Sequence, residues 1–164
     1  MGDQMGDVAV KITALHPKVA DAVASILTEA RARSLNVGVF SGVRQPEDQE
    51  KLYALGRTVV NPNGKTPEKP LGDIVTNGKP WSSWHNYGLA IDIVFKNEKG
   101  WTWDKKFDEW EELGKVGEIF NLEWGGRWKM QDLPHFQKRG SIQGVGHAKE
   151  ILFSKGLDFL WNLV

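Results

Sequence analysis

The feature that most constrains the fold is an apolar stretch at residues 89–95 with one carboxylate in its middle. Side chains in a β-strand alternate between two faces, which places the odd-numbered residues of this stretch together on one apolar face. Asp92 therefore lies on the other face, between Ala90 and Val94. A carboxylate on so apolar a strand requires a partner, because burying an unpaired charge is costly. The stretch predicts a strand whose single charged group is paired.

Histidines near this carboxylate could supply the partner. His85 precedes Asp92 by seven residues, and the intervening Gly88 allows a tight turn that folds the imidazole back over the carboxylate. Downstream, Asp132 stands three residues before His135 in a second candidate strand. Imidazoles and carboxylates are the donors of hydrolytic zinc sites, which use three protein ligands and keep a fourth position open. The pattern indicates a zinc site formed by His85, Asp92 and His135.

Two further residues could take part in catalysis. Spacing alone leaves Asp132 as a ligand, a turn residue or a general base. A hydrolytic zinc site needs such a base, which accepts a proton from water and passes it to the leaving amine. Arg44 follows a predicted strand and could stabilise an oxyanion or hold a substrate carboxylate, although an arginine taken alone is more often a surface cation. His16 and His147 have no comparable neighbours, and we expect structural roles for both.

Composition narrows the classes of protein that remain. The 164 residues are enough for one well-packed domain, residues 1–164, and too few for two. Lysine plus arginine and aspartate plus glutamate both number 21, so net charge gives no footprint for nucleic acid or an anionic membrane. Cysteine is absent, which excludes disulfides and thiolate-only metal sites. Residues 1–7 lack the basic and apolar regions of a secretory signal, and no apolar run reaches the roughly 18 residues that span a bilayer. We expect synthesis in the cytoplasm and no membrane insertion.

The order of elements predicts an α+β fold with a small antiparallel sheet flanked by helices. Alternating side chains predict strands at residues 37–41, 89–95, 122–125 and 133–137. Helical periodicity predicts helices that begin at Pro17 and Pro46 (the latter capped by Gly56), a helix from an Asp104 cap to Asn121, and a last helical segment at 145–163 interrupted by Gly156. Residues 57–80 are rich in Gly, Pro and Asn and predict a long loop, either a cover over the site or a plain mobile loop.

Motifs in order between residues 37 and 137 resemble a family of cell-wall enzymes. They are Ser41-Gly42-Val43-Arg44 with Gln49, Tyr53 and Gly56-Arg57-Thr58, then Ser83-x-His85-x-x-Gly88-x-Ala90-x-Asp92, then Trp124-Gly125-Gly126 and Asp132-x-Pro134-His135-Phe136. Together they resemble the zinc D,D-carboxypeptidase and L-alanyl-D-glutamate peptidase family, which includes the VanY-type carboxypeptidases and many phage endolysins.

The resemblance implies a role for each matching residue: zinc ligands at His85, Asp92 and His135, a general base at Asp132, a transition-state or substrate-binding role for Arg44, and a substrate contact for Ser83. The family base is often Glu, and Asp also occurs, so the role of Asp132 is intact. The chain looks most like the compact endopeptidases of lysins. We therefore expect a monomeric phage endolysin that reaches the wall after release and cuts the L-alanyl-D-glutamate bond of peptidoglycan stems. The alternative is a D-alanyl-D-alanine carboxypeptidase.

Two other classes of protein share part of the pattern. A non-catalytic zinc-containing binding module would keep the three ligands, but it would need neither Asp132 nor Arg44. A non-haem iron oxygenase also uses two histidines and one carboxylate, usually with the carboxylate two residues from the first histidine on a strand-rich barrel. Here the separation is seven residues and several helices are predicted. The pattern favours a hydrolytic peptidase.

Overall fold

The computed structural model describes residues 12–55 and 76–164. The helices are α1 (Pro17–Ala32), α2 (Pro46–Ala54), α3 (Phe107–Ile119), α4 (Val145–Lys155) and α5 (Leu157–Trp161), with short 3₁₀ turns η1 (Trp84–Tyr87) and η2 (Gly125–Arg127). The strands are β1 (Val37–Ser41), β2 (Ala90–Asn97), β3 (Gly100–Thr102), β4 (Glu123–Trp124) and β5 (His135–Gln137). They form one antiparallel sheet in the order β1-β2-β5-β4, and β3 pairs with β2. The predicted α+β class with a small antiparallel sheet is confirmed.

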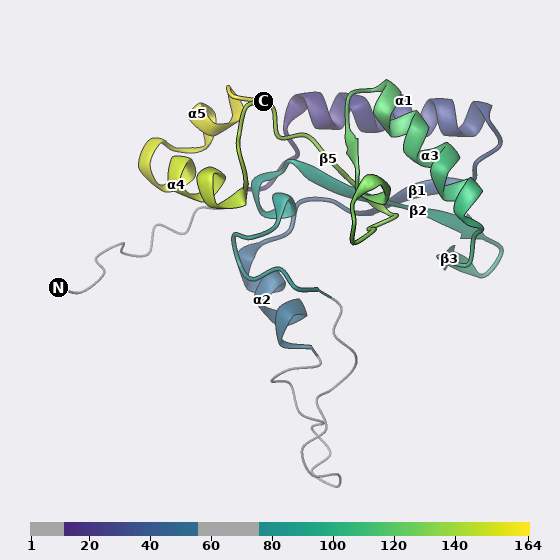
Figure 1. Cartoon of the computed structure of the whole chain (residues 1–164), viewed down its shortest axis with the longest axis horizontal. Coiled ribbons are helices and arrows are strands. Elements are labelled where there is room, and N and C mark those ends of the chain that lie inside the picture. Colours follow the sequence, from purple (N-terminus) through teal and green to yellow (C-terminus); the bar gives the residue numbers. More distant parts are fainter. Residues whose placement is uncertain (1–11, 56–75) are drawn as a thin grey trace, which may run out of the picture.

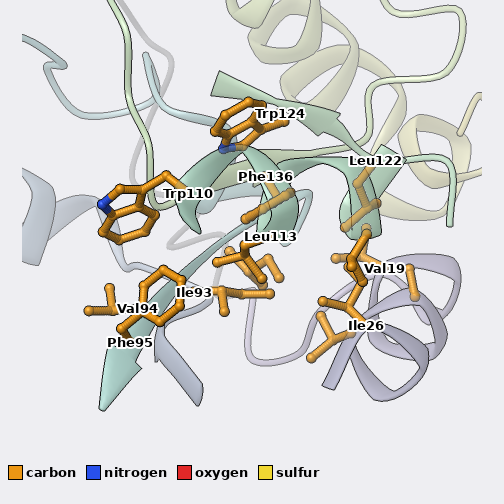
Figure 2. Packing of buried hydrophobic residues seen from close by; sticks show 14 residues of the cluster. Val19, Ile26, Ile93, Val94, Phe95, Trp110, Leu113, Leu122, Trp124 and Phe136 are labelled. Atoms are coloured by element: carbon orange, nitrogen blue, oxygen red, sulfur yellow. The ribbon is translucent and has the colours of Figure 1, made fainter. Parts of the chain in front are cut away.

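One face of the sheet carries the main hydrophobic core. Helices α1 and α3 pack on this face, while α2 lies on the other side of the sheet (Figure 1). Ile91, Ile93 and Phe95 are at most 1% exposed, as the alternation along β2 predicts. Figure 2 shows Ile93 and Phe95 beside Trp110 and Leu113 of α3. Asp92 lies on the opposite face of β2 and is partly exposed there, so it is available for a site.

A second, smaller hydrophobic cluster lies under α4 and α5 and fixes the turn before β2. Gly88 has φ +70°, and a Cβ there would lie 2.6 Å from the carbonyl oxygen of Ala14. The His16 N–H donates to the Gly88 carbonyl at 2.9 Å, and the Trp161 indole N–H donates to the Tyr87 carbonyl at 2.9 Å. A side chain at this position would be strained as well as crowded, which explains the glycine.

Two glycines of α3 let the helix approach the sheet closely. A Cβ at Gly114 would overlap the indole of Trp124, and a Cβ at Gly117 would overlap the ring of Phe136. The Trp124 indole N–H donates to the Leu133 carbonyl at 2.8 Å. The rear of the sheet is therefore closely packed behind the segment that carries His135.

Most predicted boundaries agree with the structure, and the differences have local causes. Pro17 and Pro46 begin α1 and α2, as expected of proline in a first helical turn, and Gly156, with φ +85°, separates α4 from α5. The predicted cap at Asp104 is wrong: the cap of α3 is Lys106, whose backbone N–H donates to the Glu109 side chain at 3.1 Å.

Some features were missed or lie elsewhere. Strand β3 was not predicted, because three residues are too few for an alternation pattern. The Gly56 cap, the Arg57 and Thr58 positions of the first motif and most of the predicted 57–80 loop lie outside the described residues. Within residues 12–55 and 76–164, no helix has the length and apolar character needed to cross a bilayer.

Candidate metal centre

Three predicted ligands come together on the open face of the sheet. Strand pairing places Asp92 of β2 directly beside His135 of β5. The η1 turn, closed by Gly88 in the left-handed region, brings His85 back over the start of β2. One ligand atom from each of His85, Asp92 and His135 lies within 4.8 Å of the other two. The fold therefore brings together the side chains that the sequence separates by up to 50 residues.

In both His85 and His135, the ring nitrogen farther from Asp92 makes a hydrogen bond (the outer nitrogen), and the other, inner nitrogen points toward Asp92. His85 Nδ1 donates to the Gly42 carbonyl at 2.8 Å, and its Nε2 lies 3.3 Å from Asp92 Oδ1. His135 Nε2 donates to Gln137 Oε1 at 3.0 Å, and its Nδ1 lies 3.4 Å from the same Asp92 oxygen. An acceptor on the outer nitrogen sets the tautomer, so the lone pair of the inner nitrogen faces the cluster.

This donor set fits zinc. Two imidazole nitrogens and one carboxylate oxygen are ligands that catalytic zinc takes, and the chain has no cysteine to compete. Burial raises the pKa of Asp92, but the interactions with the His135 and His85 imidazoles outweigh this effect and hold the pKa well below its usual range. Asp92 is therefore ionised at neutral pH, and its side chain is 17% exposed.

The cluster opens into a groove of about 920 Å³. Ser83 and Asp132 line this groove, as a substrate contact and a base would require. Asp132 is exposed, yet the groove walls remove part of its hydration, and this loss raises its pKa above the usual range. The nearby Asp92 charge raises the pKa further, while His135 opposes it.

Glycine makes room for the Asp132 backbone. A Cβ at Gly125 would lie 2.5 Å from the Asp132 carbonyl oxygen, and the Asp132 N–H donates to the Gly125 carbonyl at 3.0 Å. The Trp124-Gly125-Gly126 motif therefore has a steric reason: it lets the segment that carries Asp132 pass close to η2.

Arg44 lies in the groove and is not a free surface cation. Its guanidinium donates to Ser41 Oγ at 3.0 Å and to Gln49 Oε1 at 3.1 Å, and Nη2 lies 3.7 Å from Asp92 Oδ2. Gln49 is fully buried and donates to the Gly78 carbonyl at 2.7 Å. Arg44 lines the groove and is held in one orientation by Ser41, Gln49 and Asp92.

The two other histidines lie outside the cluster. His16 caps α1: its Nδ1 accepts from the Lys18 N–H at 3.1 Å, and its Nε2 donates to the Trp161 carbonyl at 3.1 Å. His147 Nδ1 accepts from the Gln143 N–H at 3.3 Å. Both make local structural contacts, as expected.

Sequence reasoning assigned no role to Gln137 or to the Gly42 carbonyl, which orient the two histidines. Gln137 carried a usable signal, because it lies two residues after His135 in the same strand and therefore on the same face. The Gly42 carbonyl gave no such signal, because every residue has a backbone carbonyl and Gly42 lies 43 residues from His85 in the sequence.

Comparison with known proteins places this geometry among peptidoglycan enzymes. Residues 76–138 match a family described as D-alanyl-D-alanine carboxypeptidase. Over 132 residues the chain is 32% identical to the peptidoglycan L-alanyl-D-glutamate endopeptidase CwlK of Bacillus subtilis, covering 75% of this chain and 72% of that protein.

Solved structures agree in fold. The L-Ala D-Glu endopeptidase ChiX of Serratia marcescens matches with a TM-score of 0.50 and 21% identity, over 76% of this chain and 80% of that one. The vancomycin resistance D,D-pentapeptidase VanY, solved as an E175A mutant with Zn(II), matches with a TM-score of 0.52 and 15% identity, over 92% of this chain and 89% of that one.

Proposed function

This chain belongs to the family of D-alanyl-D-alanine carboxypeptidases and L-alanyl-D-glutamate endopeptidases, and from that membership we propose that it uses zinc to cut the L-alanyl-D-glutamate bond of peptidoglycan stems. As a member, it is a metallopeptidase that acts on peptidoglycan. The observation that carries the proposal is the convergence of His85, Asp92 and His135 within 4.8 Å in a groove that also contains Asp132 and Arg44. We take the active form to be a monomer.

In the proposed reaction, each groove residue has a separate task. Zinc held by His85, Asp92 and His135 would supply Lewis acidity, which polarises a carbonyl and makes water more acidic. Asp132 accepts a proton from the attacking water and returns it to the leaving amine, so that the amide bond is replaced by a carboxylate and an amine. Arg44 donates to the developing oxyanion or to a substrate carboxylate, and Ser83 contacts the peptide. The raised pKa of Asp132 suits a group that must both accept and release a proton.

The choice of bond rests on the relative and on the shape of the groove. CwlK, which shares 32% of its aligned residues with this chain, is an L-alanyl-D-glutamate endopeptidase. Trp103, just after β3, and Val145, at the start of α4, both line the groove, and we take it to admit a peptide that continues beyond the site. The second candidate is a D-alanyl-D-alanine carboxypeptidase, which Arg44 favours because a guanidinium could pair with a terminal carboxylate.

Three measurements test the proposal. Chelation should abolish hydrolysis of purified peptidoglycan and added zinc should restore it; anomalous diffraction at the zinc edge should then show the ion between the three side chains. Mass spectrometry of the digest should find free L-Ala carboxyl ends on the glycan fragment and new D-Glu amino ends. Release of single D-Ala residues with the L-alanyl-D-glutamate bond intact would replace the endopeptidase with the carboxypeptidase.

We further propose that the protein acts as a phage endolysin, a use that the resemblance to lysins supports. The expected result is that purified protein clears a suspension of isolated cell walls, and that intact cells making it in the cytoplasm lyse only after a membrane-permeabilising protein is co-expressed. Lysis without permeabilisation would point to another route to the wall.

A further inference from the structure

The open face of the sheet carries three exposed aromatic side chains beside the groove. Phe40 of β1 is 48% exposed, Trp101 of β3 is 40% exposed, and Trp103, just after β3, is 49% exposed. We call these three residues the aromatic patch. A contiguous exposed apolar surface on a folded protein commonly marks a binding site, because leaving it in water forgoes the free energy of burial.

The patch has a defined geometry. The Phe40 ring centroid lies 5.5 Å from that of Trp101 and 5.0 Å from that of Trp103, and the rings are nearly perpendicular in both pairs. The Lys96 ammonium lies 4.5 Å from the Trp101 ring centroid, and a Cβ at Gly38 would lie 2.7 Å from Lys96 Cε. Gly38 therefore leaves space for Lys96 to hold Trp101, so the rings form a fixed surface with low conformational freedom.

The patch is continuous with the proposed catalytic groove. Phe40 and Trp103 line that groove together with His85 and Asp92. Phe40 directly precedes Ser41, which pairs with Asp92 in the sheet. A substrate that reaches past the metal ligands toward β3 must pass over these rings.

The chemistry of the substrate narrows what the rings would contact. A peptidoglycan stem consists mostly of charged groups and small methyl side chains, which offer little flat surface. Its first residue, L-Ala, is joined to the lactyl group of N-acetylmuramic acid, so a sugar lies one residue from the L-alanyl-D-glutamate bond. A pyranose ring presents a flat C–H face and an N-acetyl methyl group, and both are suited to packing on an aromatic face.

We propose that the aromatic patch is a subsite for the glycan, on which an amino sugar next to the stem peptide packs against Trp103 and Phe40. This inference rests on the proposed function, because only cleavage close to the sugar brings the glycan to this end of the groove. It makes the enzyme selective for stems still attached to glycan over free stem peptides.

The first experiment compares two substrates that differ only in the sugar. One is the disaccharide N-acetylglucosamine–N-acetylmuramic acid carrying the stem peptide, and the other is the same peptide with an N-lactyl cap. We expect kcat/KM to be about 10-fold higher for the disaccharide substrate, the size of one good aromatic contact. The Trp103→Leu variant, which keeps apolar area but loses the aromatic face, should bring the ratio close to one. Trp103→Phe should retain most of it.

Phe159 of α5 supplies the matched control. It is 43% exposed, and α5 lies at the opposite end of the molecule from β3 (Figure 1). Phe159→Leu should keep the wild-type substrate ratio. A wild-type ratio of one, or a ratio unchanged in Trp103→Leu, would overturn the proposal.

The second experiment uses binding to metal-free protein, so that it does not depend on hydrolysis. The disaccharide alone should change tryptophan fluorescence with a dissociation constant at least about fivefold weaker in Trp103→Leu. Equal binding by both proteins would contradict the subsite, as would a stable dimer in sedimentation velocity that Trp103→Leu dissociates. Product analysis distinguishes a failure of the proposed function from a failure of the subsite. Release of D-Ala alone would overturn the proposed bond, whereas loss of the sugar effect would overturn only the subsite.

Discussion

His16 and His135 are buried to nearly the same degree but use their ring nitrogens differently. His16 is 6% exposed, and both of its nitrogens make hydrogen bonds, one to the Lys18 N–H and one to the Trp161 carbonyl. His135 is 7% exposed, with one nitrogen bonded to Gln137 and the other directed at Asp92. The two side chains differ in pKa as well as in contacts. Burial lowers the pKa of His16. Burial also lowers that of His135, but the hydrogen bond that the ring donates to the Asp92 carboxylate outweighs this effect, and the pKa rises.

Burial alone therefore does not distinguish His16, with its structural contacts, from His135, which we propose as a ligand. A ligand needs one ring nitrogen held by an acceptor and the other left to face further donors. His85 and His135 meet this requirement. In His16 both ring nitrogens are already used in hydrogen bonds that cap α1 and attach it to the Trp161 carbonyl.

Removing one ligand should abolish both metal binding and turnover. We expect His135→Ala to lose stoichiometric zinc and all hydrolysis, because two remaining donors cannot hold the ion tightly. His16→Ala should keep zinc and activity and lose about 1 kcal/mol of stability, the usual cost of a lost helix cap. Zinc content after dialysis, measured by mass spectrometry, checks both variants. Equal zinc loss in the two variants would contradict the assignment of His135 as a ligand and of His16 as a structural residue.

Asp132→Asn should separate the metal from the chemistry. The variant should keep zinc and lose activity by a factor on the order of 100 to 10,000, as expected when a general base is removed. Steady-state kinetics at measured zinc content test this. Near-full hydrolysis with zinc bound would make Asp132 a structural residue.

Arg44→Lys should fail to restore function even though it keeps the charge. A lysine cannot reproduce the planar donors that contact Ser41, Gln49 and the groove together, so we expect kcat to fall by roughly 100- to 1,000-fold. Zinc binding should persist, and the thermal midpoint should change little. Unaltered kinetics in Arg44→Lys would reduce Arg44 to a simple source of positive charge.

Gln137→Leu should weaken zinc binding without removing a ligand. It deletes the acceptor that orients His135, and the loss of such a partner costs about 10- to 100-fold in metal affinity. The control is Gln143→Leu, an exposed glutamine in the segment before α4. Competition with a zinc chelator measures both constants. Equal affinity in the two variants would show that Gln137 does not orient His135.

The smallest effect concerns pH and His16. Because the folded pKa of His16 is below the ordinary 6.5, the unfolded chain binds more protons between these two values. This contribution to stability is complete above pH 6.5 and is lost as pH falls through the folded pKa. His16→Asn keeps an acceptor for the Lys18 N–H but does not titrate there. Denaturant unfolding from pH 7 to 5 should show a shallower decline for the variant than for the wild type; parallel curves would contradict it.

Much of the fold was accessible from the sequence because local signals were strong. Pro17, Pro46 and the alternation of β2 each act through nearby atoms, and each element was found. The proximity of His85, Asp92 and His135 was predicted because the chain has only four histidines and imidazole is a chemically specific donor. The cap at Lys106 was missed because Asp104 has the more usual capping side chain, and Gln137 was missed although its place in the strand indicated it. The support of Arg44 by Gln49 depends on how the chain turns between β1 and α2, which residue type does not reveal.

The glycines of α3 have a consequence for how this enzyme could vary. Gly114 makes room for Trp124, and the Trp124 indole holds the Leu133 carbonyl two residues before His135. A methyl group added at Gly114, on the far side of the sheet, would therefore displace the Trp124 indole. This shift would move the Leu133 carbonyl and, with it, the backbone that positions His135. In directed evolution, a library restricted to the residues that line the groove would not include Gly114 or Trp124. Selection for altered metal preference should recover changes around α3 that never contact substrate.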